Sequence, residues 1–158
     1  MNPPADLPPR DKPTRMVVVE SQPFFVLGIE NYLHGYPQIK LVAHTTNAAD
    51  AFEVVEAHHP DLVLADVCLP GKSGIELVAQ LRSQAPWLKT IVYSAHVDDH
   101  YITDAIDAGI NGYLLKDDQP EILLKAVETV MKGEQYLSEA IAGRLLRLMQ
   151  HTKTNPIK

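Results

Sequence analysis

The feature that most constrains this chain is a regular alternation of short apolar runs with segments of helical periodicity. Five such runs lie at 15–20, 39–44, 62–66, 88–95 and 110–115, and each precedes a segment with apolar residues at helical spacing. Apolar runs bounded by turn residues are typical of strands that are buried on both faces of a parallel sheet. The sequence therefore predicts an α/β fold with a doubly wound, five-stranded parallel sheet.

Turn and capping residues indicate where the intervening helices begin and end. Pro23 suits the first turn of a helix, because its missing N–H costs little there. The candidate N-terminal caps of the later helices are Asn47, Asp98, and Asp117 or Asp118, and another helix is expected to begin at Lys72 or Ser73. Gly109 is expected just beyond the end of the helix that begins near Asp98.

The two ends of the chain differ from this repeating pattern. Residues 1–14 contain five prolines and several charges, which predicts a disordered arm before a domain at 15–134. Residues 135–150 are expected to form an additional C-terminal helix, followed by a flexible tail at 151–158. The apolar stripe of this helix consists of Leu137, Ile141, Leu145, Leu148 and Met149. Two alternatives are open: the helix packs back on its own domain, or it is a linker that forms a coiled-coil-like dimer contact.

Charge and composition exclude several classes of protein. A formal net charge of −6 argues against nonspecific nucleic-acid binding by the domain, and no recognition helix is visible. Cys68 is the only cysteine, so an internal disulfide is impossible, which fits a cytoplasmic setting. No apolar stretch approaches the roughly 20 residues of a membrane-spanning helix. We therefore expect a cytoplasmic chain that binds neither membrane nor specific DNA.

Polar residues occupy the same relative place at the ends of four predicted strands. They are Glu20 with Ser21, Asp66, Ser94 and Lys116. Because the carboxyl ends of parallel strands share one edge of the sheet, we expect these side chains to converge where such sheets bind ligands. A carboxylate can attack phosphorus, so Asp66 is the predicted phosphate acceptor, with Lys116 as cation and Ser94 as hydroxyl donor. Glu20 and Asp66 would also offer oxygen ligands to Mg²⁺.

Three segments carry a family pattern. They are Asp-Val-Cys-Leu-Pro-Gly-Lys-Ser-Gly at 66–74, Ser-Ala at 94–95, and Ala-Gly-Ile-Asn-Gly-Tyr-Leu-Leu-Lys-Asp at 108–117. Together they resemble the receiver domain of bacterial two-component response regulators, and the last segment resembles the NarL/FixJ subgroup. The resemblance covers about 15–137 and implies a flavodoxin-like or CheY-like (βα)5 fold with an extra C-terminal helix.

The resemblance also implies a role for each matching residue. Asp66 would accept phosphate from a histidine kinase or phosphotransfer protein, and Lys116 would bind the phosphoryl group. Ser94 and Tyr113 would form the conformational switch, and the backbone carbonyl of Cys68 would be a metal ligand. Dimerisation would be the output, and a helix-turn-helix domain would follow in a longer parent unless the chain is a stand-alone receiver.

The chain departs from the family pattern after the first strand. The family has two adjacent acids there, whereas this chain has Glu20 and Ser21. Ser21 is uncharged and therefore a poorer ligand for a hard dication, so we expect weakened Mg²⁺ binding. Two functions stay open: a receiver that is phosphorylated on Asp66, and a degenerate pseudo-receiver that acts as a phosphorylation-independent interaction domain.

An enzyme on the same fold is a third class, and the sequence argues against it. The first strand-to-helix turn lacks the Ser/Thr/Gly-rich cradle that a flavin phosphate needs. Position 68, two residues after Asp66, holds Cys68 and not the second acid that an aspartyl-phosphate phosphatase would use. We therefore do not expect the chain to be an enzyme.

Overall fold

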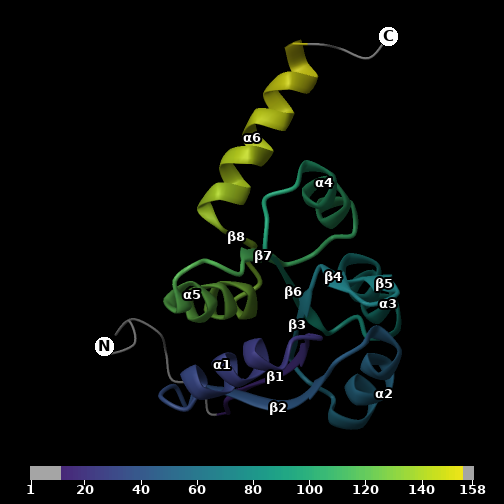
Figure 1. Ribbon diagram of the computed structural model, residues 1–158, viewed down its shortest axis with the longest axis vertical. Helices are drawn as coiled ribbons and strands as arrows, with labels where there is room; N and C mark the ends of the chain where they lie inside the picture. Colours follow the sequence, from purple (N-terminus) through teal and green to yellow (C-terminus); the bar gives the residue numbers. More distant parts are fainter. Residues whose placement is uncertain (1–11, 155–158) are drawn as a thin grey trace.

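The computed structural model describes residues 12–154, which form a parallel sheet flanked by helices (Figure 1). The sheet has six strands in the order β2-β1-β3-β6-β7-β8, and all neighbouring strands are parallel. Its strands are β1 (Thr14–Val19), β2 (Ile39–Thr45), β3 (Leu62–Asp66), β6 (Lys89–Ser94), β7 (Gly112–Leu115) and β8 (Tyr136–Leu137). The helices are α1 (Pro23–Leu33), α2 (Ala48–His58), α3 (Gly74–Gln84), α4 (Asp99–Asp107), α5 (Pro120–Met131) and α6 (Glu139–Thr154). The predicted doubly wound α/β fold is confirmed.

Both faces of the sheet are buried, because consecutive residues of a strand enter different hydrophobic cores. On β1, Met16 and Val18 pack into the core that α1 and α5 cover, whereas Val17 and Val19 pack into the core of α2 and α3. Figure 1 shows these two pairs of helices on opposite sides of the sheet. Burial on both faces explains the uninterrupted apolar run of β1. It also holds the strands rigidly, so the polar residues at their carboxyl ends have defined positions.

Several predicted helix ends are confirmed. The side chains of Asn47, Ser73 and Asp98 each accept a hydrogen bond from a backbone amide in the first turn of the following helix. Gly109 follows α4 with a φ of 70°, in the left-handed region that favours glycine. The chain also contains a two-residue antiparallel ladder between β4 (Cys68–Leu69) and β5 (Lys72–Ser73), which the sequence did not indicate.

The prediction that Asp117 or Asp118 caps α5 is wrong. The helix begins at Pro120, whose fixed φ and missing N–H already suit the first turn. Asp118 instead accepts hydrogen bonds from the Leu115 amide, at 2.9 Å, and from the Ser138 hydroxyl. Its carboxylate therefore ties the end of β7 to the start of α6.

The segment after α5 is also different from the prediction. Residues Tyr136–Leu137 pair with β7 as a short sixth strand, so the expected five-stranded sheet is one strand too small. The predicted helix at 135–150 begins only at Glu139 and continues to Thr154, into the segment expected to be a tail. Residues 1–11, and with them most of the predicted arm, lie outside the described residues, as do residues 155–158. Within residues 12–154, no helix is both long and apolar enough to cross a bilayer.

The part of α6 up to Leu148 packs on its own domain. Ile141 is fully buried, and Leu145 and Leu148 pack against the same core as α4. Arg144 holds Asp99 of α4 through two contacts, Nε–Oδ1 at 2.5 Å and Nη2–Oδ2 at 3.0 Å. Figure 1 shows α6 beside α4 at its base and projecting away from the sheet beyond it. Of the two alternatives for this helix, packing on its own domain describes this part, and dimerisation stays a prediction.

Candidate functional site

Two carboxylates and one ammonium group meet at the carboxyl ends of β1, β3 and β7. Lys116 Nζ lies 2.7 Å from Asp66 Oδ2 and 3.1 Å from Glu20 Oε2. Glu20 follows β1, Asp66 ends β3 and Lys116 follows β7, so the parallel register brings all three to one edge. The structure thus brings together three of the residues singled out in the sequence.

Asp66 is held in place by the loop that follows β3. Its Oδ1 accepts a hydrogen bond from the Cys68 amide at 2.9 Å, which leaves Oδ2 facing Lys116. The loop turns back so closely that a Cβ on Gly74 would lie 1.9 Å from the Asp66 carbonyl oxygen. Glycine is therefore required at this position for the loop to hold the carboxylate where it is.

Both polar groups and aromatic rings surround the ammonium group of Lys116. Besides the two carboxylates, Gln22 Oε1 lies 3.3 Å from Nζ. The ring centroids of Phe25 and Tyr93 lie 4.4 Å and 5.0 Å from Nζ, within the range of cation–π attraction. The side chain is only 10% exposed. These contacts confine the ammonium group to one position between the carboxylates.

Glu20 is fully buried, yet both of its oxygens have partners. The Tyr93 hydroxyl donates to Oε2, and the backbone N–H of Gln22 donates to Oε1 at 3.0 Å. Together with Lys116, these donors make the burial of a carboxylate tolerable. Burial and, to a lesser extent, the bond to Glu20 raise the pKa of Tyr93, so its hydroxyl keeps its proton and acts as the donor.

Tyr93, Gln22 and Phe25 were not singled out in the sequence, although they complete the site. Adjacent residues on a strand point to opposite faces of the sheet. Tyr93 therefore points to the opposite face from Ser94, which is the face that α1 covers. That alternation was the available signal. Whether the side chain then reaches Glu20 depends on its length and rotamer, which the sequence does not specify.

Ser94 and Tyr113 lie beside the charged cluster without joining it. The Ser94 hydroxyl donates to the His96 carbonyl at 2.9 Å and accepts from the His96 amide at 3.3 Å. Tyr113 is fully buried, and within residues 12–154 its hydroxyl makes no hydrogen bond of normal geometry. Burial raises the pKa of Tyr113 to about 12, while the Ser94 hydroxyl acts in the opposite direction. The predicted switch pair is therefore adjacent, with Tyr113 already in the interior.

The residues at this edge fit a divalent cation poorly. Both oxygens of Glu20 already accept hydrogen bonds, and Ser21 adds no charge. The Cys68 carbonyl, a ligand implied by the resemblance, is neutral and cannot replace the missing acid. In the part of the chain that the structure describes, no three His, Cys, Asp or Glu side chains are grouped to hold a metal. The cation that the geometry places beside Asp66 is the Lys116 ammonium group.

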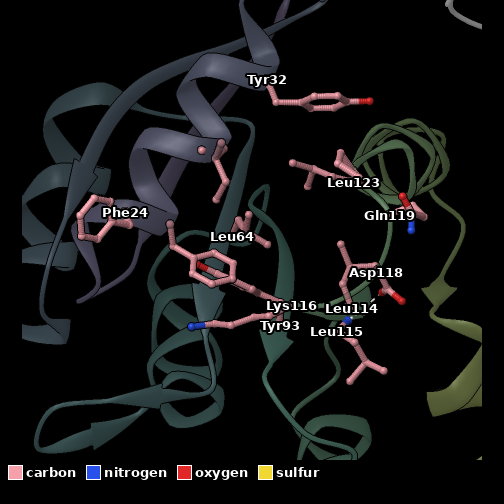
Figure 2. Close-up of a pocket in the computed structure, with 14 residues that line it drawn as sticks. Phe24, Tyr32, Leu64, Tyr93, Leu114, Leu115, Lys116, Asp118, Gln119 and Leu123 are labelled. Atoms are coloured by element: carbon pink, nitrogen blue, oxygen red, sulfur yellow. Dashed lines mark hydrogen bonds between the residues drawn. The ribbon is translucent and has the colours of Figure 1, made fainter.

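Two cavities lie on either side of Lys116. One, of about 430 Å³, opens beside Asp66, and Ser21, Cys68 and Ala95 are among its lining residues. The other, of about 450 Å³, is largely aromatic and aliphatic and lies between α1 and α5. Figure 2 shows this second cavity with Tyr93 and Lys116 lying next to each other at one end. Asp66 itself is only 4% exposed, and the first cavity is the opening that its carboxylate lines.

Comparison with known proteins matches most of this chain to one protein family. Residues 16–128 match the family described as the response regulator receiver domain. The transcriptional regulatory protein DegU of Brevibacillus brevis is 30% identical over 133 residues. The nitrate/nitrite response regulator protein NarL of Escherichia coli is 32% identical over 130 residues.

The similarity covers most of this chain and only part of the relatives. It spans 84% of this chain and 56% of DegU, and 82% of this chain and 60% of NarL. A crystal structure of a LuxR-family two-component response regulator from Aurantimonas sp. is similar with a TM-score of 0.82 and 25% identity. That similarity covers 87% of this chain and 99% of the other.

Proposed function

This chain belongs to the response regulator receiver domain family, as a receiver of the NarL type, and on that premise we propose that it accepts a phosphoryl group on Asp66. The observation that carries the proposal is the 2.7 Å contact between Lys116 Nζ and Asp66 Oδ2 at the accessible edge of the sheet. A fixed ammonium group beside the attacking carboxylate can neutralise the charge of the transferred phosphoryl group. Receiver domains are signalling modules and not typical enzymes, and we assign this chain the same role.

In the proposed reaction, one carboxylate oxygen of Asp66 forms a bond to phosphorus while the bond from phosphorus to the donor breaks. With a histidine kinase or phosphotransfer protein as donor, the broken bond is P–N. The histidine nitrogen keeps the electron pair and takes a proton from solvent. Ala95 is among the residues lining the cavity through which the donor approaches, and its small side chain leaves that approach open.

The proposed switch begins at Ser94. A phosphoryl oxygen on Asp66 competes with the His96 carbonyl for the Ser94 hydroxyl, so the bond of 2.9 Å within the loop is broken. Tyr113 already lies in the interior, which leaves the loop at 95–98 and α4 as the parts that rearrange. The surface formed by α4, β7 and α5 then changes its pairing, and homodimerisation is the proposed output.

Incubation with acetyl phosphate followed by intact-mass measurement tests the role of Asp66. We expect a gain of one phosphoryl group per chain, and no gain for Asp66→Asn, which keeps the shape of the side chain but removes the nucleophilic charge. A gain that persists in Asp66→Asn would show that another residue is labelled.

The chain spans less than two thirds of the relatives' length, so the role of the parent protein is part of the proposal. We propose that the parent is a cytoplasmic transcription regulator with a DNA-binding domain and that this chain does not itself bind DNA or membrane. The formal net charge of −6 supports this division of labour. In a gel-shift experiment the chain alone should leave promoter DNA unshifted.

Receiver domains generally bind Mg²⁺ at the phosphorylation site. Here we propose that Glu20, Asp66 and the Cys68 carbonyl bind it weakly, because Ser21 stands where the family has a second acid. Slow phosphorylation is the expected consequence.

A second candidate function is that of a pseudo-receiver, an interaction domain that works without phosphorylation. The saturation of Glu20 by three donors, together with Ser21, favours it. Light scattering with beryllofluoride separates the two candidates. A change in the molar mass of the oligomer favours the phosphate-accepting receiver, and an unchanged molar mass favours the pseudo-receiver.

A further inference from the structure

We propose that Tyr93 is a positioning residue: its hydroxyl keeps Glu20 paired with Lys116 and thereby disfavours a divalent cation in the pocket. The inference deepens the proposed function and rests on it for its biological meaning, since it concerns the cation that accompanies phosphoryl transfer. The contacts that carry it are those among the three side chains themselves.

Tyr93 reaches Glu20 across an intervening strand. It lies on β6, whereas Glu20 follows β1, and β3 separates the two in the sheet. Neighbouring strands are about 4.8 Å apart, so roughly 10 Å separates the two backbones. The two side chains close this gap together, and the Tyr93 hydroxyl donates to Glu20 Oε2. A shorter side chain at this position would leave that oxygen without its donor.

The ring of Tyr93 is itself held firmly. The residue is buried and packs against Phe25, with ring centroids 5.9 Å apart and an angle of 46° between the planes. The same ring forms one wall of the site around Lys116 Nζ, 5.0 Å from its centroid. Figure 2 shows these two side chains side by side at the end of the cavity between α1 and α5. One residue therefore orients both the carboxylate and the ammonium group.

A divalent cation would have to undo this arrangement. Glu20 would exchange its hydrogen bonds for a metal contact, although it has no exposed surface through which to turn outward. The ion would also come close to the Lys116 ammonium group, 3.1 Å from Glu20 Oε2, and like charges in a buried site repel strongly. The Lys116 ammonium group already balances one of the two carboxylate charges, and a divalent cation would bring the cluster to a net positive charge.

Tyr93 could also serve only to fill the core, because its ring packs with Leu64 and Leu114 in the same cluster. The two roles separate at the hydroxyl group. Phenylalanine keeps the ring and its packing, so Tyr93→Phe removes only the donor to Glu20. Tyr32→Phe is the matched control, because Tyr32 lines the same cavity and its buried hydroxyl makes no hydrogen bond of normal geometry within residues 12–154.

The test is a titration of the full chain with MgCl2, followed by the NMR shift of the Cys68 amide, which donates to Asp66. We expect Tyr93→Phe to lower the half-saturating Mg²⁺ concentration about ten- to hundredfold, the range set by one hydrogen bond to a charged group. Tyr32→Phe should leave it unchanged. An unchanged value for Tyr93→Phe, or an equal decrease for Tyr32→Phe, would overturn the proposal. Should Tyr93→Phe fail to fold, Tyr93→Met removes the same hydroxyl with a more adaptable side chain and carries the same expectation.

The same samples are then incubated with acetyl phosphate, and their intact masses are measured. An absence of label on Asp66 in every variant would contradict the proposed function, whereas the Mg²⁺ titration would still decide the role of Tyr93. The two failures are therefore distinguishable.

Discussion

The charged pocket beside α1 and the face formed by α4 and α6 use polar groups in opposite ways. In the pocket, Glu20, Asp66 and Lys116 are almost fully buried, and each carboxylate lies within 3.1 Å of the ammonium group. On the α4–α6 face, the ion pair between Arg144 and Asp99 is 44% and 41% exposed. The polar groups of the first region are buried charges that depend on each other, whereas those of the second form a solvated contact beside the apolar packing of Ile141.

This difference indicates where the molecule can move. A buried network in which every member is satisfied resists rearrangement, because losing one partner strands a charge. An exposed ion pair costs little to break, and the buried Tyr113 hydroxyl nearby has no hydrogen bond of normal geometry to lose within residues 12–154. We infer that the pocket is the more rigid of the two regions and that the α4–α6 face rearranges more easily.

Replacing Lys116 is expected to have the largest effect. Lys116→Met leaves Glu20 and Asp66 as uncompensated buried charges, so the free energy of unfolding in urea should fall by about 3–5 kcal/mol. Combining it with Glu20→Gln should restore part of that loss. A loss below about 1 kcal/mol would mean that the pocket is not held by its charges.

The two buried tyrosines on opposite faces of the sheet give the next test. Tyr93→Phe removes a donor to a buried carboxylate and should cost about 1–3 kcal/mol of unfolding free energy. Tyr113→Phe removes a hydroxyl without such a bond and should change it by less than about 0.5 kcal/mol. Chemical denaturation of both variants checks this, and equal losses would break the comparison between the regions.

Alkaline pH should weaken the fold through the same side chains. The pKa of Tyr113 is raised from 10.0 to about 12 in the folded chain, so folding holds a proton that the unfolded chain releases. The stabilisation is complete below pH 10.0 and is lost as the pH rises through about 12. The pKa of Tyr93 is raised as well and acts in the same direction. Unfolding free energies measured across this range should fall as the pH rises, and less steeply for Tyr113→Phe. A flat profile would contradict the raised pKa of Tyr113 in the folded chain.

The smallest effect is expected for the exposed ion pair. Arg144→Ala should speed hydrogen exchange of the α6 amides and leave the exchange of β1 and β3 unchanged. The Arg144 guanidinium lowers the pKa of Asp99, so the contact is present above the ordinary value of 3.8 and is lost as the pH falls through the lowered one. If hydrogen exchange of the α6 amides near neutral pH is unaltered in Arg144→Ala, the Arg144–Asp99 ion pair does not hold α6 in place.

The sequence was sufficient for the longer strands, for the helices and for the approximate site. Uninterrupted apolar runs indicated buried parallel strands, and the shared edge of such strands is why Asp66 and Lys116 could be expected to meet. Caps such as Asn47 and Asp98 could be predicted because they act on residues adjacent in the chain. These inferences depend on local periodicity and on topology.

Contacts between distant side chains were not predictable in the same way. The bond between Tyr93 and Glu20 depends on how one side chain lies across a third strand, and Asp118 holds Ser138 across a loop and does not cap the nearest helix. The short strand at Tyr136–Leu137 is stabilised by its pairing with β7 and has no periodicity of its own. In each case packing decided between options that local sequence left equal.

Phosphorylation of three forms of the full chain by acetyl phosphate, at millimolar Mg²⁺ and followed by peptide mapping, tests the role of Asp66 most directly. The expected result is slow labelling of Asp66 in the natural chain, faster labelling in Ser21→Asp, which restores the second acid, and none in Asp66→Asn. Label that persists in Asp66→Asn, or label that forms only in Ser21→Asp and never in the natural chain, would contradict the assignment of this chain as a phosphate-accepting receiver.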